Sequence, residues 1–182
     1  IYEANSLVNI KTDPDRHAHF KKFELTSQQH IELAKICKIN GVAYNSSIWN
    51  IEFLSWIDPY LDFYKVGSGD LTCYPIIEKF AKNGKPIILS TGLSSIEEVK
   101  HVVNFIQETN DIYKNKDMLC LLQCTSMYPI SLKEANLKVI DVYKELFGLS
   151  SGYSDHTEGL IALKIAGNMG ANVLEFHFTD NR

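Results

Sequence analysis

The stretch "PIILSTGLSSIEEVKHVVNFIQE", residues 86–108, contains the unit on which the fold prediction depends. Its apolar opening predicts a buried strand, which ends on the polar pair Ser90–Thr91. Ser94 and Ser95 can cap a following helix because each has a glutamate three residues later. Apolar residues then recur at helical spacing. The stretch therefore predicts a strand, a polar strand end and an amphipathic helix.

The same order recurs along the chain. Five apolar or β-branched runs are each followed by a helix-like segment, and a sixth run stands near the end. Successive runs start roughly 20 to 30 residues apart, the size of a strand–helix unit. Strict alternation of strands and helices predicts parallel strands joined by right-handed crossovers. The six predicted strands are residues 41–48, 63–69, 86–92, 118–126, 149–155 and 172–179.

Two α/β architectures fit this alternation, a doubly wound sheet and a (β/α)8 TIM barrel. A doubly wound sheet concentrates its site at one switch point, whereas a barrel draws its site from the ends of many strands. Polar residues follow nearly every run, so we predict a barrel, incomplete here with about six of its eight units. No G-x-G-x-x-G motif or P-loop occurs. The polar strand ends are Ser46–Ser47, Lys65, Ser68, Ser90–Thr91, Thr125–Ser126, Ser154–His156, Glu175 and His177.

Bulk composition is that of an ordinary globular domain. The chain has 182 residues, 45% hydrophobic and 22% charged, with a net charge of -4. Neither a nucleic-acid nor a membrane partner is expected, because the charge is acidic and no apolar run approaches the roughly 18 to 20 residues that cross a bilayer. Four cysteines predict buried free thiols and a cytoplasmic location. The start without Met suggests a piece of a longer protein. Histidines 17, 19, 30 and 101 have charged neighbours and are predicted to lie on the surface.

The last two predicted strands each bring a histidine to the same end of the barrel. Alternation puts Glu175 and His177 on one face, and Phe176 and Phe178 on the other, towards the helices. His156 follows the preceding strand. Two imidazoles suit Mn²⁺, Zn²⁺ or Fe²⁺ more than Mg²⁺. The alternatives are a structural Glu–His pair and a solvated or capping His156.

Lys65 is the most informative single residue, because a lysine inside a barrel strand must reach an anion or lose hydration. It can clamp a phosphate or carboxylate, form a Schiff base, or lie on a partly exposed face. The "GSGD" segment after it, residues 67–70, offers backbone N–H groups and the Ser68 hydroxyl as an anion cradle. Ser90 and Ser126 add hydroxyl donors.

Taken together, the segments "YKVGSGD", "GKPIILSTGLSSIEEV", "LLQCTSMYP", "GYSDHTEG" and "LEFHFT" resemble the N-acetylneuraminate (sialic acid) synthase family, which includes the legionaminate and pseudaminate synthases. The resemblance covers nearly the whole chain. It implies a phosphoenolpyruvate-using TIM barrel with a small C-terminal antifreeze-like domain, and a homodimer. The implied reaction is a transferase condensation of phosphoenolpyruvate with an open-chain N-acylated hexosamine such as N-acetylmannosamine. The products are a nine-carbon 2-keto acid and phosphate, and the implied cofactor is Mn²⁺ or Mg²⁺.

The resemblance also implies residue roles. Lys65, Asp70 and Glu175 would be catalytic, and His156 and His177 would ligate the metal. Asp70, Tyr128 and Glu175 would lie near the sugar or order the site. The residues that would contact phosphoenolpyruvate are Lys65, Ser68, Ser90, Ser126 and Ser154. Ser47 would stand at the position where a threonine of the family commonly binds phosphate.

Departures from the family pattern leave alternatives open. "SSIWN", residues 46–50, replaces the usual Ser-Thr-Pro-Phe-Asp. The family's first two strands, with a phosphate-binding lysine, and its C-terminal domain are absent, so the 182 residues alone are predicted to be inactive as a synthase. The alternatives are another metal- or Lys-dependent TIM-barrel aldolase acting on sugar phosphates, and an inactive barrel fragment with only a binding role.

Overall fold

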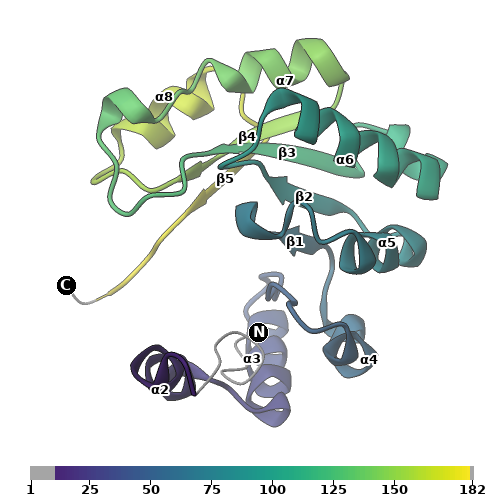
Figure 1. The fold of residues 1–182 in the computed structure, drawn as a ribbon, viewed down its shortest axis with the longest axis vertical. Helices are drawn as coiled ribbons and strands as arrows, with labels where there is room; N and C mark the ends of the chain where they lie inside the picture. The colour runs from purple at the N-terminus through teal and green to yellow at the C-terminus, as the bar shows by residue number, and fades with distance from the viewer. Residues whose placement is uncertain (1–10, 181–182) are drawn as a thin grey trace. The chain divides into compact units, whose positions relative to one another are not determined.

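The computed structural model describes residues 11–180. The chain divides after Tyr64 into two compact units. The first unit is helical. Its helix α3 begins at a capping box, in which the Thr26 hydroxyl accepts the Gln29 backbone N–H and the Gln29 side chain accepts the Thr26 N–H. The helices of this unit are α2 (Pro14–Phe23), α3 (Ser27–Ile39) and α4 (Leu54–Ile57) (Figure 1).

The prediction of a strand at residues 41–48 is wrong. The segment is described throughout, and no strand is assigned to it. It is anchored instead by a side chain, with Asn45 Nδ2 donating to the Phe63 carbonyl at 2.6 Å. A strand requires a ladder of hydrogen bonds to a neighbour, and the sheet of the described residues contains only later segments.

Two histidines predicted to lie on the surface are buried. His17 and His30 are 9% and 5% exposed, whereas His19 and His101 are exposed. The His30 ring packs against Trp56 with ring centroids 5.8 Å apart, and its Nδ1 is hydrogen-bonded to the Tyr44 hydroxyl. Burial lowers the pKa of His30 below its usual value. Charged sequence neighbours misled the prediction, because tertiary packing decides which side of a helix is covered.

The second unit confirms the alternation of strands and helices. Its sheet has the order β1-β2-β3-β4-β5, and the pairs from β2 to β5 are parallel. The sheet curls as a half-barrel with helices α6, α7 and α8 over one face (Figure 1). A doubly wound sheet would reverse its strand order, so the sequential order excludes it. The elements are β1 (Tyr64–Val66), α5 (Tyr74–Asn83), β2 (Ile87–Ser90), α6 (Ile96–Thr109), β3 (Leu119–Cys124), α7 (Val139–Phe147), β4 (Ser150–Asp155), α8 (Ile161–Asn168) and β5 (Val173–Phe176).

The helix α6 is built as the opening stretch predicts. Ser95 accepts the Glu98 backbone N–H, and the Glu98 carboxylate accepts the Ser95 N–H and hydroxyl. These hydrogen bonds lower the pKa of Glu98. Of the two predicted capping serines, Ser95 is therefore the N-cap. The apolar stripe of α6 ends in Ile106, which is fully buried.

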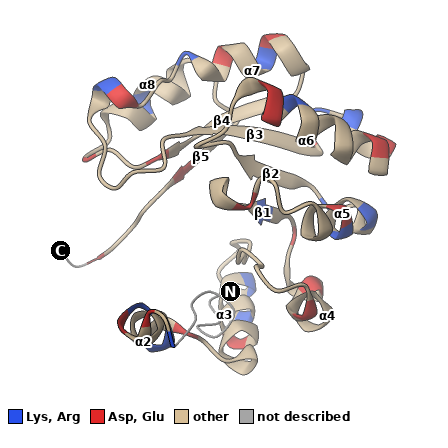
Figure 2. Ribbon diagram, in the orientation of Figure 1, with Lys and Arg blue, Asp and Glu red and all other residues tan. Residues whose placement is uncertain are grey.

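A hydrophobic layer lies between the sheet and its helices. Leu89, Leu121 and Tyr153 point into it from β2, β3 and β4 and are fully buried, and Ile140 of α7 is buried with them. Burying each such side chain contributes about 1.5 to 3 kcal/mol. The strands β2 and β3 have no charged residue, whereas β1 carries Lys65 and β5 a glutamate (Figure 2). The sheet therefore brings charged residues to the site from β1, from β5 and, with Asp155, from the end of β4.

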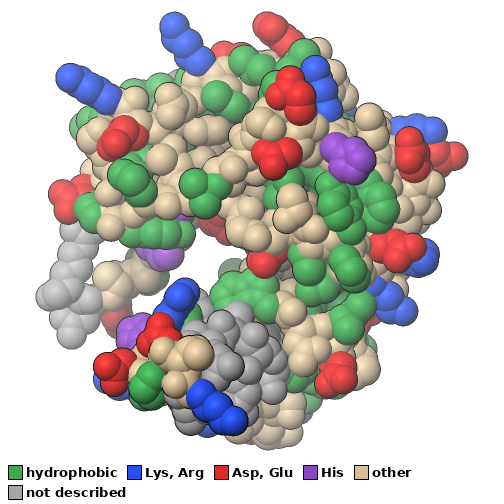
Figure 3. Space-filling model, viewed as in Figure 1, with side chains coloured by type: hydrophobic (Ala, Val, Ile, Leu, Met, Phe, Trp, Pro, Cys, Tyr) green, Lys and Arg blue, Asp and Glu red, His purple; other side chains and the backbone are tan. Residues whose placement is uncertain are grey.

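The outer surface shows the usual mixture of side chains. Hydrophobic side chains lie between charged ones on the visible face (Figure 3). Phe176 and Phe178, predicted to pack on helices, are 52% and 85% exposed. No helix follows β5 within residues 11–180 to cover them. In the same described part, no helix has the length and apolar character to cross a bilayer.

The cysteines give a first test of this core. Cys120 of β3 is 7% exposed, and burial raises the pKa of its thiol to about 12. Since the thiolate is the reactive form, Cys120 is expected to resist alkylation by iodoacetamide at pH 8 in the native chain and to react once the chain is unfolded. Peptide mass spectrometry after timed labelling measures this. Rapid native labelling of Cys120 would contradict the buried strand.

Candidate functional site

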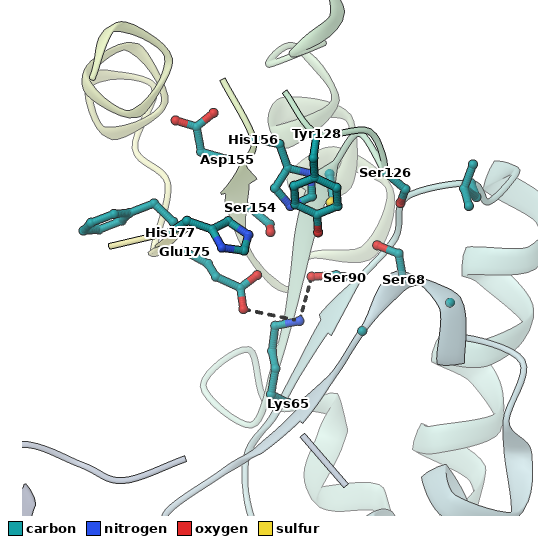
Figure 4. Close-up of a pocket in the computed structure, with 15 residues that line it drawn as sticks. Lys65, Ser68, Ser90, Ser126, Tyr128, Ser154, Asp155, His156, Glu175 and His177 are labelled. Carbon is teal, nitrogen blue, oxygen red and sulfur yellow. Dashed lines mark hydrogen bonds and ion pairs between the residues drawn. The ribbon is translucent and has the colours of Figure 1, made fainter. Parts of the chain in front are cut away.

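A cavity of about 490 Å³ lies at the carboxyl ends of the strands in the second unit. Nine of the eleven predicted site residues line it together (Figure 4). Strand register explains part of this, because Cys124 pairs with Ser154 and Ser154 pairs with Glu175, so that these three side chains share the inner face of the half-barrel. The nine are Lys65, Ser68, Ser90, Ser126, Tyr128, Ser154, His156, Glu175 and His177.

Lys65 lies at the base of this cavity. Its Nζ donates to Ser90 Oγ at 2.8 Å and to the Val66 carbonyl at 3.0 Å. It also lies 3.5 Å from Glu175 Oε1, across the half-barrel from β1 to β5. The Lys65 side chain is 12% exposed and that of Glu175 is 40% exposed. A largely buried ammonium with one weak, half-exposed counter-ion is arranged to receive an anion from the cavity.

Serine hydroxyls line the wall beside the lysine. Ser68 stands on the short helical turn after β1, and its Oγ accepts the Gly92 backbone N–H at 2.9 Å. The hydroxyls of Ser68 and Ser126 approach each other in Figure 4. Because the Ser68 oxygen is already an acceptor, its proton is available to a ligand. Ser90 and Ser154 are buried nearby, at 2% and 5% exposure.

Three rings form the opposite wall. Those of Tyr128 and His156 stack with centroids 3.8 Å apart, and the His177 ring lies 5.6 Å from that of His156. His156 Nδ1 lies 2.7 Å from the Thr125 carbonyl. A carbonyl only accepts, so Nδ1 carries the proton and a neutral His156 presents the lone pair of Nε2. The imidazole is therefore held in the tautomer that can ligate a cation through Nε2.

Two predicted residues are not among those lining the cavity. Asp70 ends the helical turn at 68–70, and its Oδ2 lies 3.4 Å from the position that a Cβ on Gly67 would take. The carboxylate thus folds back towards its own turn. Ser47 belongs to the first unit, where it lines a cavity of about 370 Å³ together with Tyr44 and Trp49. The roles predicted for Asp70 and Ser47 stay predictions.

Several lining residues were not predicted. Asp155 stands among the polar strand ends but was given no site role, and its Oδ1 accepts the Thr157 backbone N–H at 2.8 Å and the Tyr153 hydroxyl at 3.0 Å. Burial, followed by the Asp155 charge, raises the pKa of Tyr153. Leu93 is 87% exposed with φ +62°, a conformation that no sequence signal marks. Gly67 and Gly69 belong to the segment predicted as an anion cradle, and the lining residues that were given no site role are Leu93, Cys124, Asp155 and Phe176.

Solved structures share this fold. The N-acetylneuraminic acid (sialic acid) synthetase of Leptospira borgpetersenii superposes with a TM-score of 0.86 over 96% of this chain and 60% of that chain, at 24% identity. A truncated 3-deoxy-D-arabino-heptulosonate 7-phosphate synthase of Thermotoga maritima superposes less well, with a TM-score of 0.65 over 84% of this chain, 60% of that chain and 15% identity. At these identities the likeness concerns the fold, and both support a partial barrel.

Curated relatives are closer in sequence. The chain is 35% identical over 165 residues to the N-acetylneuraminate-9-phosphate synthase of Homo sapiens, covering 88% of this chain and 44% of that protein. It is 36% identical over 160 residues to the N,N'-diacetyllegionaminic acid synthase of Campylobacter jejuni, covering 87% of this chain and 47% of that protein. The chain thus spans about half the length of these relatives. The NeuB family model matches residues 3–182. With that match over nearly its whole length, the chain belongs to the NeuB family.

Proposed function

We propose that the chain is part of a sugar-acid synthase that condenses phosphoenolpyruvate with an open-chain N-acylated hexosamine. The products would be a sialic-acid-type 2-keto acid of nine carbons and inorganic phosphate. The observation that carries the proposal is the cavity in which Lys65, four serines and two histidines converge. The cavity combines groups that can bind an anion with groups that can hold a metal beside a carbonyl. The proposed reactants, phosphoenolpyruvate and an open-chain sugar, carry an anion and a carbonyl respectively.

The anion side supports a clamp role for Lys65. Lys65 Nζ donates to Ser90 Oγ and lies 3.5 Å from the Glu175 carboxylate, contacts that suit a cationic clamp better than the free amine that Schiff-base chemistry needs. Its charge would instead neutralise the carboxylate or phosphate of phosphoenolpyruvate, with Ser68, Ser126 and Ser154 orienting the oxygens. Glu175 would then be freed to bind a sugar hydroxyl or to hold a proton during the reaction.

The ring side fits a divalent metal, Mn²⁺ or Mg²⁺. His156 and His177 would hold it, with Nε2 of His156 as the donor atom, and water or substrate oxygens would complete its shell. Within residues 11–180 no group of three or more His, Cys, Asp or Glu side chains forms a metal cluster, so these two imidazoles are what the described residues offer. A bound cation would supply Lewis-acid polarisation of the sugar aldehyde. Tyr128, stacked on His156, would border the sugar.

We propose that the natural protein completes an eight-stranded barrel with units that precede β1, and that it carries a C-terminal domain and assembles as a homodimer. The coverage of about half of each curated relative supports this. An open half-barrel would leave strand edges unpaired, which proteins avoid. The 182 residues alone are therefore expected to lack synthase activity.

The function is tested on the natural protein that carries this sequence. Incubated with phosphoenolpyruvate, Mn²⁺ and N-acetylmannosamine or a diacetamido hexose, it is expected to release phosphate and form a 2-keto acid, both only when a sugar is present. Phosphate is measured by a coupled assay and the keto acid by mass spectrometry. A sugar-independent release would contradict the proposal. So would a Schiff base at Lys65 trapped by borohydride with pyruvate, which would indicate a lysine-dependent aldolase.

A further inference from the structure

The loop that leaves β2 brings its backbone against two of the serine hydroxyls. Gly92 is buried, and its N–H donates to Ser68 Oγ at 2.9 Å. A Cβ added to Gly92 would lie 2.3 Å from Ser126 Oγ, 2.9 Å from Ser68 Oγ and 3.1 Å from the Cys124 carbonyl oxygen. Its φ lies outside the left-handed region that favours glycine. Space, rather than backbone conformation, therefore requires glycine here.

We propose that Gly92 is a positioning residue that holds the hydroxyls of Ser68 and Ser126 together as one subsite for the anionic end of an enol phosphate. Both oxygens lie within 3 Å of the same point, so one phosphoryl or carboxylate group can contact both. The Gly92 N–H occupies a lone pair of Ser68 and fixes the position of its oxygen, and the hydroxyl keeps its own proton to donate to the ligand. This inference rests on the proposed function and extends it to a residue with no side chain.

The consequence of adding a methyl group follows from what surrounds it. Serine side chains rotate at little cost, and the Cys124 carbonyl oxygen at 3.1 Å needs only a small shift, so the fold of Gly92→Ala is expected to survive while both hydroxyls turn out of place. Losing one hydrogen bond to a charged group weakens binding by about 10- to 100-fold, so losing two is expected to cost at least that much. The sugar does not depend on these hydroxyls, so its KM is expected to stay unchanged.

The test is calorimetric titration of phosphoenolpyruvate into the natural protein and its Gly92→Ala variant, with KM measured for both substrates. The matched control is Gly167→Ala in α8, where the added Cβ meets only Leu174 Cδ1 at 3.8 Å. We expect an affinity loss of about tenfold or more for Gly92→Ala and less than about twofold for the control. The double variant Ser126→Ala, Gly92→Ala should lose less affinity for phosphoenolpyruvate than the product of the two single fold-losses, because both changes act on one subsite.

The outcomes separate the two proposals. Wild-type protein that binds no phosphoenolpyruvate would overturn the proposed function, and with it the ligand assigned here. If the wild type binds phosphoenolpyruvate and Gly92→Ala binds it with the same affinity, only the role of Gly92 is overturned. An equal rise in KM for both substrates, with a lowered Tm, would show that Gly92 is only structural and would also overturn the inference. If Gly92→Ala does not fold, Ser68→Ala with an unchanged affinity would overturn it.

Discussion

Lys65→Met is expected to lower the affinity for phosphoenolpyruvate by about 100-fold or more, because it removes the largely buried ammonium that would pair with the bound anion. Lys65 is the one Lys or Arg among the described residues that line the cavity. Without its ammonium, the Glu175 carboxylate would face the incoming anion and repel it. Methionine keeps an unbranched chain of similar length, and it removes the charge together with the hydrogen bonds to Ser90 Oγ and the Val66 carbonyl. Calorimetric titration at low and high salt measures the loss.

A surface lysine provides the control for this change. Lys82 of α5 pairs with Glu78 at 2.6 Å, and its side chain is 59% exposed. Exposed pairs of this kind contribute at most about 1 kcal/mol to stability, so Lys82→Met should leave phosphoenolpyruvate binding unchanged. An affinity of Lys65→Met equal to that of wild type would contradict the clamp role, and the anion would then have to bind elsewhere.

Gly152→Ala is expected to cost about 3 kcal/mol or more of the free energy of unfolding. Gly152 pairs with Val173 in the β4–β5 ladder. A Cβ there would lie 2.1 Å from the Val173 carbonyl oxygen and 2.8 Å from Leu122 Cδ2. A backbone oxygen cannot rotate away as a side chain can, so the ladder must open. Because β5 carries Glu175, and His177 follows it, binding should be lost together with stability.

Denaturant unfolding followed by circular dichroism measures the loss of free energy of unfolding. Thermal unfolding should show a fall in Tm of about 6–12 °C or more. Gly69→Ala is the matched control, because its Cβ would meet nothing within 4 Å. The free energy of unfolding of Gly69→Ala should lie within about 0.5 kcal/mol of that of the wild type. If Gly152→Ala were equally stable, β4 and β5 would not be paired in the register described.

Much of the site could be predicted because parallel strands expose their carboxyl ends at one edge. Polar residues just after apolar runs, such as Ser90 and His156, therefore converge whatever the details of packing. Residues that act through the backbone carry no such signal. Gly92 matters through its N–H and its missing Cβ, and Leu93 through a positive φ. The metal, the sugar, the homodimer and the cytoplasmic location stay predictions.

The sequence by itself determined the alternation of strands and helices, a capped start of α6 at Ser94 or Ser95, and the family of the chain. These depend on local periodicity and on motifs that are contiguous in the chain. Only the tertiary structure decided that residues 41–48 form no strand, that His17 and His30 are buried, and that Asp70 does not line the cavity. It also decided that Lys65 of β1 meets Glu175 of β5 across the half-barrel. Pairing, burial and contact depend on partners distant in the chain, and local sequence does not specify where those partners lie.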